Sequence, residues 1–143
     1  IWSPTCDFLG SDFGPKGYNL TFKVQDNNCP YFGESTKRIK FLLEKPVVDW
    51  DTFIPPNAFS PNGDGINDVF KLTNLNEPSQ NLPIDGCDDN FESIIFVDRT
   101  GVEVYKTNDK YFEWDGGNRS PGVYFYYIKY TKSEYKGSVT IVY

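Results

Sequence analysis

The chain has 143 residues, and 14 Lys and Arg against 20 Asp and Glu give it a formal net charge of −6. An acidic chain without a basic face is a poor partner for nucleic acid or an anionic membrane surface. The absence of His excludes Ser-His-Asp and Cys-His nucleophiles and His-ligated zinc or haem. No segment is apolar over the length of a membrane-spanning helix, so no direct membrane insertion is expected. The 10 Tyr and 12 Phe, beside 12 Gly and 10 Pro, favour strands and turns, and we predict an all-β fold.

Two segments in the first part of the chain alternate between apolar and polar residues. Residues 19–25 and 38–43 place every second side chain on an apolar face, which predicts two consecutive antiparallel strands. The residues expected to face inward are Leu20, Phe22, Val24, Ile39, Phe41 and Leu43. Two strands cannot close a sandwich, which usually needs about seven. We therefore expect residues 1–46 to be the C-terminal part of an Ig-like repeat.

The cysteines indicate an exported protein rather than a metal site. Cys6, Cys29 and Cys87 lack the C-x-x-C spacing of metal and redox motifs. Cys6 and Cys29 flank the first predicted strand, and we predict a disulfide between them, with two buried thiols as the alternative. Cys87 lies in an acidic loop and is expected to be free or paired outside this chain. Trp2-x-Pro4-x-Cys6 ahead of the first strand loosely resembles the PKD-like repeats of large bacterial surface proteins.

Prolines separate this first part from the rest of the chain. Pro46, Pro55 and Pro56 interrupt any strand ladder, and strand patterns resume after them. Strands are predicted over residues 69–75, 92–98, 102–105, 122–130 and 136–143. The last strand is expected to turn Val139, Ile141 and Tyr143 toward the core. We therefore predict that residues 47–143 form an antiparallel Ig-like β-sandwich.

The sharpest local pattern is a loop rich in Asn, Asp and Gly. The side-chain oxygens of Ser60, Asn62, Asp64 and Asp68 and the carbonyl of Ile66 match the spacing of an EF-hand-like calcium loop. Such a loop points the oxygens of alternate residues at one centre, and calcium is therefore a candidate cofactor. Two departures are the Ser in place of the leading Asp and a Lys where the bidentate Glu is expected. The alternative is a turn in which the Asn and Asp side chains bond their own backbone amides.

A second polar pattern is Trp114-Asp115-Gly116-Gly117-Asn118. One interpretation is a sugar platform, with the Trp ring stacking on the sugar and the Asp and Asn side chains bonding its hydroxyls. The favoured interpretation is a turn with Gly at positive φ and the Trp packed into the core. No spacing singles out a pair of carboxylates for glycoside hydrolysis, so we do not expect an enzyme.

Five segments of the second part occur in an order that is more specific than any one of them. They are residues 56–70, 96–105, 114–116, 121–126 and 136–141. The ordered set resembles the gliding-motility-associated C-terminal domain, which is the type B sorting domain of the Bacteroidota type IX secretion system. The resemblance covers roughly residues 53–143 and implies an Ig-like sandwich. The turn at residues 97–101 departs from it, because family members often carry an Asn-Arg-Trp-Gly-like sequence there. The loop at residues 83–90 has no counterpart.

The resemblance implies a role without catalysis. Such domains lie at the C-terminus of large cell-surface adhesins, including gliding adhesins, and direct them through the periplasm and across the outer membrane. The implied partners are the type IX translocon and a PorP/SprF-like outer-membrane protein. The implied location is the cell surface or the exterior, in association with the outer membrane.

The terminal strand is the expected recognition element, because a free strand edge can accept a partner strand. Its residues are Lys136, Gly137, Ser138, Val139, Thr140, Ile141, Val142 and Tyr143. Two other interpretations of the function remain open. One is an adhesive or carbohydrate-binding β-sandwich module, and the other is a calcium-stabilised structural cap of an Ig-like stalk.

Overall fold

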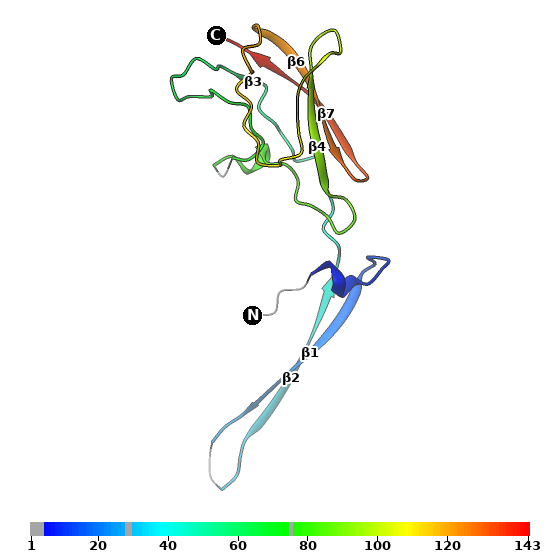
Figure 1. The fold of residues 1–143 in the computed structure, drawn as a ribbon. Coiled ribbons are helices and arrows are strands. Elements are labelled where there is room, and N and C mark those ends of the chain that lie inside the picture. The colour runs from blue at the N-terminus through cyan, green and yellow to red at the C-terminus, as the bar shows by residue number, and fades with distance from the viewer. Residues whose placement is uncertain (1–4, 28–29, 75) are drawn as a thin grey trace. The chain divides into compact units, whose positions relative to one another are not determined.

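The computed structural model describes residues 5–27, 30–74 and 76–143 (Figure 1). These residues form strands and two short 3-10 helices, η1 (Cys6–Leu9) and η2 (Pro78–Gln80), with no α-helix among them. The predicted all-β class is confirmed. The chain divides into two compact units, Ile1–Lys45 and Pro46–Tyr143, and each is described by itself.

The first unit is built on one β-hairpin. Strands β1 (Lys16–Gln25) and β2 (Glu34–Leu43) pair antiparallel along their whole length, as predicted. Their apolar side chains share one face, because Leu20 lies opposite Ile39 in the pairing. This face is only partly covered. Leu20, Phe41 and Leu43 are half-buried as expected, whereas Phe22 is 50% exposed and Val24 is 66% exposed. A two-stranded hairpin has no second layer to cover its apolar face.

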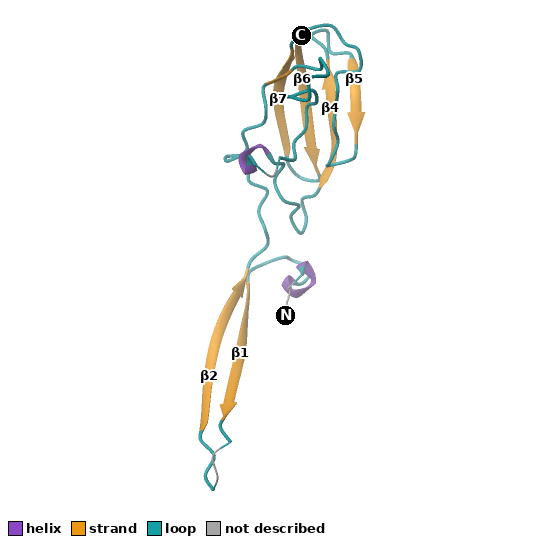
Figure 2. Ribbon diagram, turned by 90° about the vertical axis from the view of Figure 1, so that its left-hand side faces the viewer, coloured by secondary structure: helices purple, strands orange, loops and turns teal. Residues whose placement is uncertain are grey.

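The second unit contains a five-stranded sheet, whose long strands lie side by side in Figure 2. Its strands are β3 (Ala58–Phe59), β4 (Phe91–Val97), β5 (Glu103–Thr107), β6 (Gly122–Tyr130) and β7 (Glu134–Ile141). Their spatial order is β3-β7-β6-β4-β5. All neighbouring pairs are antiparallel except β3 and β7, which are parallel. The strands predicted over 92–98, 102–105, 122–130 and 136–143 correspond to β4 through β7.

The strand predicted over residues 69–75 is wrong. Among the described residues 69–74, only Phe70 forms a bridge. It pairs antiparallel with Trp114 and exchanges both backbone hydrogen bonds with it, at 2.8 and 3.0 Å. Phe70 and Leu72 are both buried, as the alternation of apolar and polar residues in the sequence predicted. Beyond them the chain turns, because the Asn81 side chain accepts the backbone N–H of Asn74 and closes a loop.

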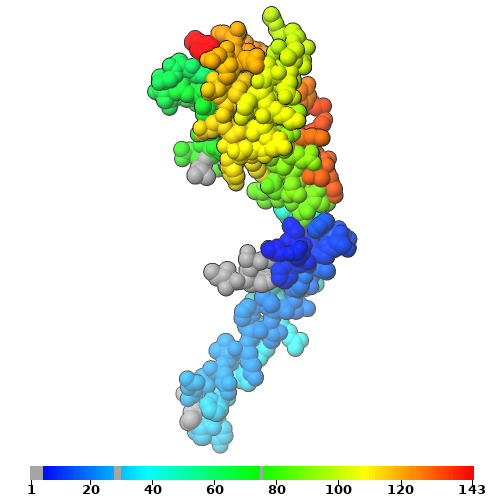
Figure 3. Space-filling model, in the orientation of Figure 1, coloured from blue at the N-terminus to red at the C-terminus, as the bar shows by residue number. Residues whose placement is uncertain are grey.

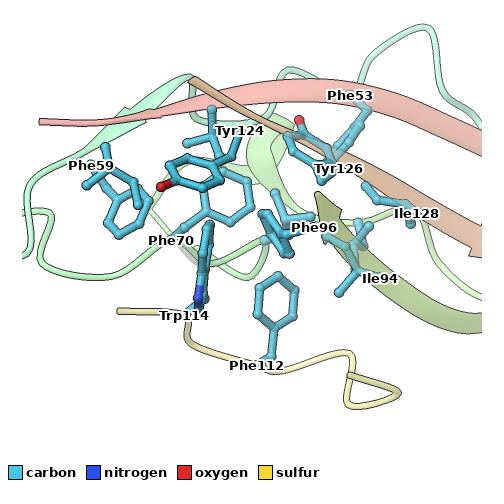
Figure 4. Packing of buried hydrophobic residues seen from close by; sticks show 14 of the residues in the cluster. Phe53, Phe59, Phe70, Ile94, Phe96, Phe112, Trp114, Tyr124, Tyr126 and Ile128 are labelled. Atoms are coloured by element: carbon cyan, nitrogen blue, oxygen red, sulfur yellow. The ribbon is translucent and has the colours of Figure 1, made fainter. Parts of the chain in front are cut away.

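The core lies between one face of the sheet and a second layer of extended loops. Strand β6 turns every second residue, Tyr124 through Tyr130, toward this core. The opposite layer contributes large side chains from outside the strands, namely Phe53, Phe70, Leu72, Leu82, Phe112 and Trp114. Figure 4 shows the aromatic rings of both layers meeting around Phe96, whose ring centroid lies 4.3 Å from that of Trp114. This packing fixes the loops that carry the candidate site.

The predicted disulfide between Cys6 and Cys29 stays a prediction, because Cys29 lies outside the described residues. Cys6 and Cys87 are each disulfide-bonded, so a free thiol at Cys87, one of the two alternatives expected from the sequence, does not occur.

Candidate recognition site at the C-terminal strand

Strand β7 is the element that the sequence analysis expected to be recognised, and one of its two edges is only partly covered. On one side it pairs with β6 along its whole length, from Glu134 to Ile141. On the other side it pairs with β3 only at Thr140 and Ile141. The Thr140 N–H donates to the Asn57 carbonyl at 2.9 Å.

The sequence before β3 explains why this cover is short. β3 runs parallel to β7, and the two residues before Asn57 are Pro55 and Pro56. Proline has no N–H to donate and is confined to the ends and edges of sheets. Backbone groups alternate sides along a strand, so Ser138 and Lys136 point their N–H and C=O groups to the same side as Thr140. β7 therefore presents an outer edge over residues 134–138 that β3 does not cover.

The two faces of β7 differ as predicted, except at the end of the chain. Val139 and Ile141 are buried against the core, whereas Lys136 and Ser138 are exposed. Tyr143 was expected to face the core, but it is 65% exposed. β7 ends at Ile141, so the alternation no longer applies to Tyr143, whose hydroxyl donates to the Arg119 carbonyl at 3.3 Å.

The loop at residues 60–68, here called the Asx-Gly loop, lies directly after β3 and projects from the surface in Figure 3. Its organising group is the carboxylate of Asp68. Oδ1 accepts the backbone N–H groups of Asn62 at 3.1 Å and Gly63 at 2.7 Å, and Oδ2 accepts that of Gly65 at 2.7 Å. The bonds from Gly63 and Gly65 are the main reason that the pKa of Asp68 lies below its usual value.

The other polar side chains of the loop also bond its backbone. Asn62 Oδ1 accepts the N–H of Asp64 at 3.0 Å, and Asp64 Oδ1 accepts the N–H of Ile66 at 2.8 Å. Ser60 closes the loop by donating its N–H to the Asn67 carbonyl at 2.8 Å. The interpretation of this segment as a backbone-bonding Asx turn is confirmed.

A calcium ion bound by Ser60, Asn62, Asp64, Ile66 and Asp68 stays a prediction. Three backbone N–H groups already point at the Asp68 carboxylate, and a cation would have to share its oxygens with them. Within the described ranges, no three Cys, Asp or Glu side chains are grouped to hold a metal.

The Asx-Gly loop, the Trp114–Asn118 segment and the end of the chain meet at one pocket of about 280 Å³. Its lining residues are Pro61, Gly63, Asp68, Val69, Asp115, Asn118 and Tyr143. The turn interpretation of the Trp114 segment is confirmed, because Gly116 and Gly117 have φ of 82° and 55°. Trp114 is only 3% exposed, so its ring has no free face for a sugar.

Sequence analysis missed a second aspartate that organises a loop. Asp98 Oδ1 accepts the hydroxyl of Thr100 at 2.6 Å and the backbone N–H groups of Thr100 and Val102 at 2.8 and 3.0 Å. These bonds lower the pKa of Asp98, and the bond from the Thr100 hydroxyl contributes most. The signal available in the sequence was an Asp at the end of a strand, two residues before Thr and three before Gly.

These features define a small β-domain with one partly uncovered strand edge and with loops held by aspartate side chains that accept backbone N–H groups. A family model, the CHU_C type IX secretion signal domain, matches residues 53–141. The match covers more than half of the chain and all five strands of the sheet, and the chain belongs to this family. No curated protein and no solved structure matches the chain.

Membership in this family confirms the resemblance drawn from the ordered segments. The family is one of secretion signals and not of enzymes. Membership in the family means that the chain carries a signal for export across the cell envelope by the type IX system. Within the described part of the chain, no helix combines the length and the apolar character needed to cross a bilayer.

Proposed function

We propose that residues 47–143 are the C-terminal signal of a large cell-surface adhesin and are recognised through residues 136–143 by the type IX translocon. A PorP/SprF-like outer-membrane protein is the proposed specific partner, and the exported protein stays associated with the outer membrane. No catalytic step belongs to this role. The observation that carries the proposal is the outer edge of β7, which β3 covers only at Thr140 and Ile141.

The mode of recognition that this edge supports is strand addition. An extended segment of the partner would pair with β7 from Glu134 toward Ser138, where β3 is absent. Main-chain hydrogen bonds would supply the affinity. The partner would also contact the exposed side chains of Lys136 and Ser138, which would add specificity to these main-chain hydrogen bonds. Because β3 is short, it leaves more of the β7 edge open to pairing with a second copy of the chain than a longer strand would. The charged side chain of Lys136 at this edge discourages such pairing.

A proline substitution tests this mode without removing the core. Ser138→Pro removes an N–H on the outer edge, whereas Val139→Pro removes one that bonds β6. With a reporter fused ahead of residue 46, we expect Ser138→Pro to fold but to accumulate in the periplasm. Ser138→Ala is the matched control and should be exported normally. Wild-type export of a folded Ser138→Pro chain would exclude the edge of β7 as the signal.

For residues 1–46 we propose the C-terminal part of an Ig- or PKD-like repeat. Support comes from the apolar face of the hairpin, on which Phe22 and Val24 are at least half exposed. Further strands of the same repeat would cover that face, because an isolated hairpin is marginally stable in water. Residues 1–46 expressed alone should be unfolded by circular dichroism. A folded, monomeric fragment would exclude this assignment.

Two alternative functions keep their own tests. An adhesive or carbohydrate-binding module predicts that the isolated second unit binds a glycan array, and binding that survives Ser138→Pro would favour it. A calcium-stabilised cap of an Ig-like stalk predicts melting that depends on calcium, which is treated in the Discussion.

A further inference from the structure

Asn62 and Gly63 form the single Asn-Gly pair of the chain, and both are exposed in the Asx-Gly loop. In such a pair the Gly backbone nitrogen can attack Cγ of the Asn side chain, since Gly has no Cβ to hinder the approach. The N–Cγ bond forms, the Cγ–Nδ2 bond breaks, and ammonia leaves with the proton of the attacking nitrogen. Water then opens the resulting succinimide at either carbonyl, which leaves an aspartate or an isoaspartate.

The structure holds both reacting groups in hydrogen bonds. The Gly63 N–H donates to Asp68 Oδ1 at 2.7 Å, and the negative carboxylate beside it opposes the loss of the proton that the attack requires. The Asn62 side chain is held at both ends by Asp64. Its Oδ1 accepts the Asp64 N–H at 3.0 Å and its Nδ2 donates to Asp64 Oδ2 at 3.0 Å. The reaction therefore requires the loop to open first.

We propose that Asn62 is a site of spontaneous deamidation that Asp68 keeps unreactive while the Asx-Gly loop is closed. The product does not restore the loop. An isoaspartate inserts an extra methylene into the main chain, so the N–H groups of Asn62, Gly63 and Gly65 no longer converge on Asp68. Either product also places a new negative charge beside Asp64 and Asp68. Deamidation at Asn62 thus occurs only after the loop has opened, and its product cannot return to the closed loop.

The rate of amide loss at Asn62 tests the proposal on the full chain. Purified protein is incubated at mildly alkaline pH and sampled by peptide mapping with mass spectrometry, and isoaspartate is detected with an isoaspartyl methyltransferase. We expect Asp68→Asn to lose the Asn62 amide roughly ten-fold faster than wild type, the factor given by losing one hydrogen bond to a charged group. Asp98→Asn removes a similar loop carboxylate that bonds Thr100 and Val102 instead of the Asn-Gly pair, and it should leave the rate unchanged.

Two further measurements separate this effect from general unfolding. In denaturant, wild type and Asp68→Asn should react at one common fast rate. Asp64→Ala removes the acceptor of Asn62 Nδ2 but keeps the N–H of residue 64 and leaves Asp68 in place. It should therefore also accelerate the reaction, and it serves if Asp68→Asn does not fold. Equal rates in folded and denatured wild type would overturn the proposal, as would a folded Asp68→Asn or Asp64→Ala chain that reacts like wild type.

Discussion

Gly137 of β7 lies directly opposite Tyr126 of β6, and the tyrosine ring occupies the space that a side chain at position 137 would need. A Cβ built on Gly137 would lie 2.3 Å from the Tyr126 hydroxyl oxygen and 2.4 Å from the ring carbon that carries it. Tyr126 is almost completely buried, so its ring cannot swing away into solvent. The Gly that the ordered sequence segments contain at this position is thus required by close packing.

Gly137→Ala is expected to destabilise the second unit. The added methyl group must displace the buried ring of Tyr126, and overpacking of this kind costs about 1–3 kcal/mol. The measurement is the free energy of unfolding from urea denaturation. Ser138→Ala, one residue further along β7 and exposed, should change stability by less than about 0.5 kcal/mol. An Ala variant at position 137 as stable as wild type would show that the ring has room to move.

The stability of the second unit should fall in acid. Asp68 and Asp98 have lowered pKa values because they accept hydrogen bonds. Burial is the largest single effect on the pKa of Asp85 and raises it, but the Phe91 N–H and Lys110 together lower this pKa below its usual value. A carboxyl whose pKa is lowered on folding stabilises the folded state above its unfolded pKa, near 3.8, and this stabilisation is lost as pH falls through the folded pKa. Stability should therefore be level near neutral pH and decline below roughly pH 4.

The control for the acid prediction is the double variant Asp68→Asn and Asp98→Asn. It should be less stable near neutral pH and show a shallower decline in acid, since two of the titrating groups are gone. The measurement is the urea midpoint as a function of pH. An acid limb as steep as that of wild type would assign the pH dependence to other carboxyls.

The calcium proposal is tested on the Asx-Gly loop itself. Asp68→Ala and Asp64→Ala should both lower the melting temperature, Asp68→Ala the more, because its carboxylate accepts three backbone N–H groups. A bound calcium ion predicts in addition that calcium raises the melting temperature of wild type and leaves the double variant unchanged. Equal melting of wild type in calcium and in chelator would discard the metal.

Limited proteolysis should cut the chain before Trp50. The Trp50 ring stacks on Tyr135 with centroids 5.3 Å apart and donates its N–H to Ser133 at 3.1 Å. A protease specific for Glu should therefore cut after Glu44 and release a folded fragment that retains Trp50. Trp50→Ala should lower the melting temperature of that fragment. A chain that resists cleavage between residues 44 and 49 and melts in one transition would show that the two units unfold together.

Strands with a clear period of two could be predicted from the sequence. Residues 122–130 were expected to form one strand, and β6 has those bounds, because alternate residues enter the core over its whole length. The strand predicted over residues 69–75 was wrong, because its alternation does not come from pairing in a sheet. Its alternation at Phe70 and Leu72 reflects burial under the sheet. Among the described residues 69–74, only Phe70 forms a β-bridge, with Trp114. Burial alone does not make a strand when no neighbour offers a ladder.

The candidate site, too, could be predicted from the sequence only in part. The ordered segments identified the family, and the spacing of Asn and Asp located the Asx-Gly loop. The sequence did not distinguish between its two interpretations, since the same oxygens can face a cation or backbone N–H groups. The partial cover of β7 depends on a pairing between Ala58 and Thr140, and no local pattern reveals a contact between residues so far apart.

That pairing also determines when the unit can fold. β3 is the first strand of the second unit, and its one partner in the sheet is β7, the last strand. A chain that emerges from its N-terminus therefore cannot add β3 to the sheet until Thr140 and Ile141 are present. The cost of closing so long a loop delays the step further. The five-stranded sheet therefore forms only on a chain that includes β7, and a chain cut before β7 has no complete sheet.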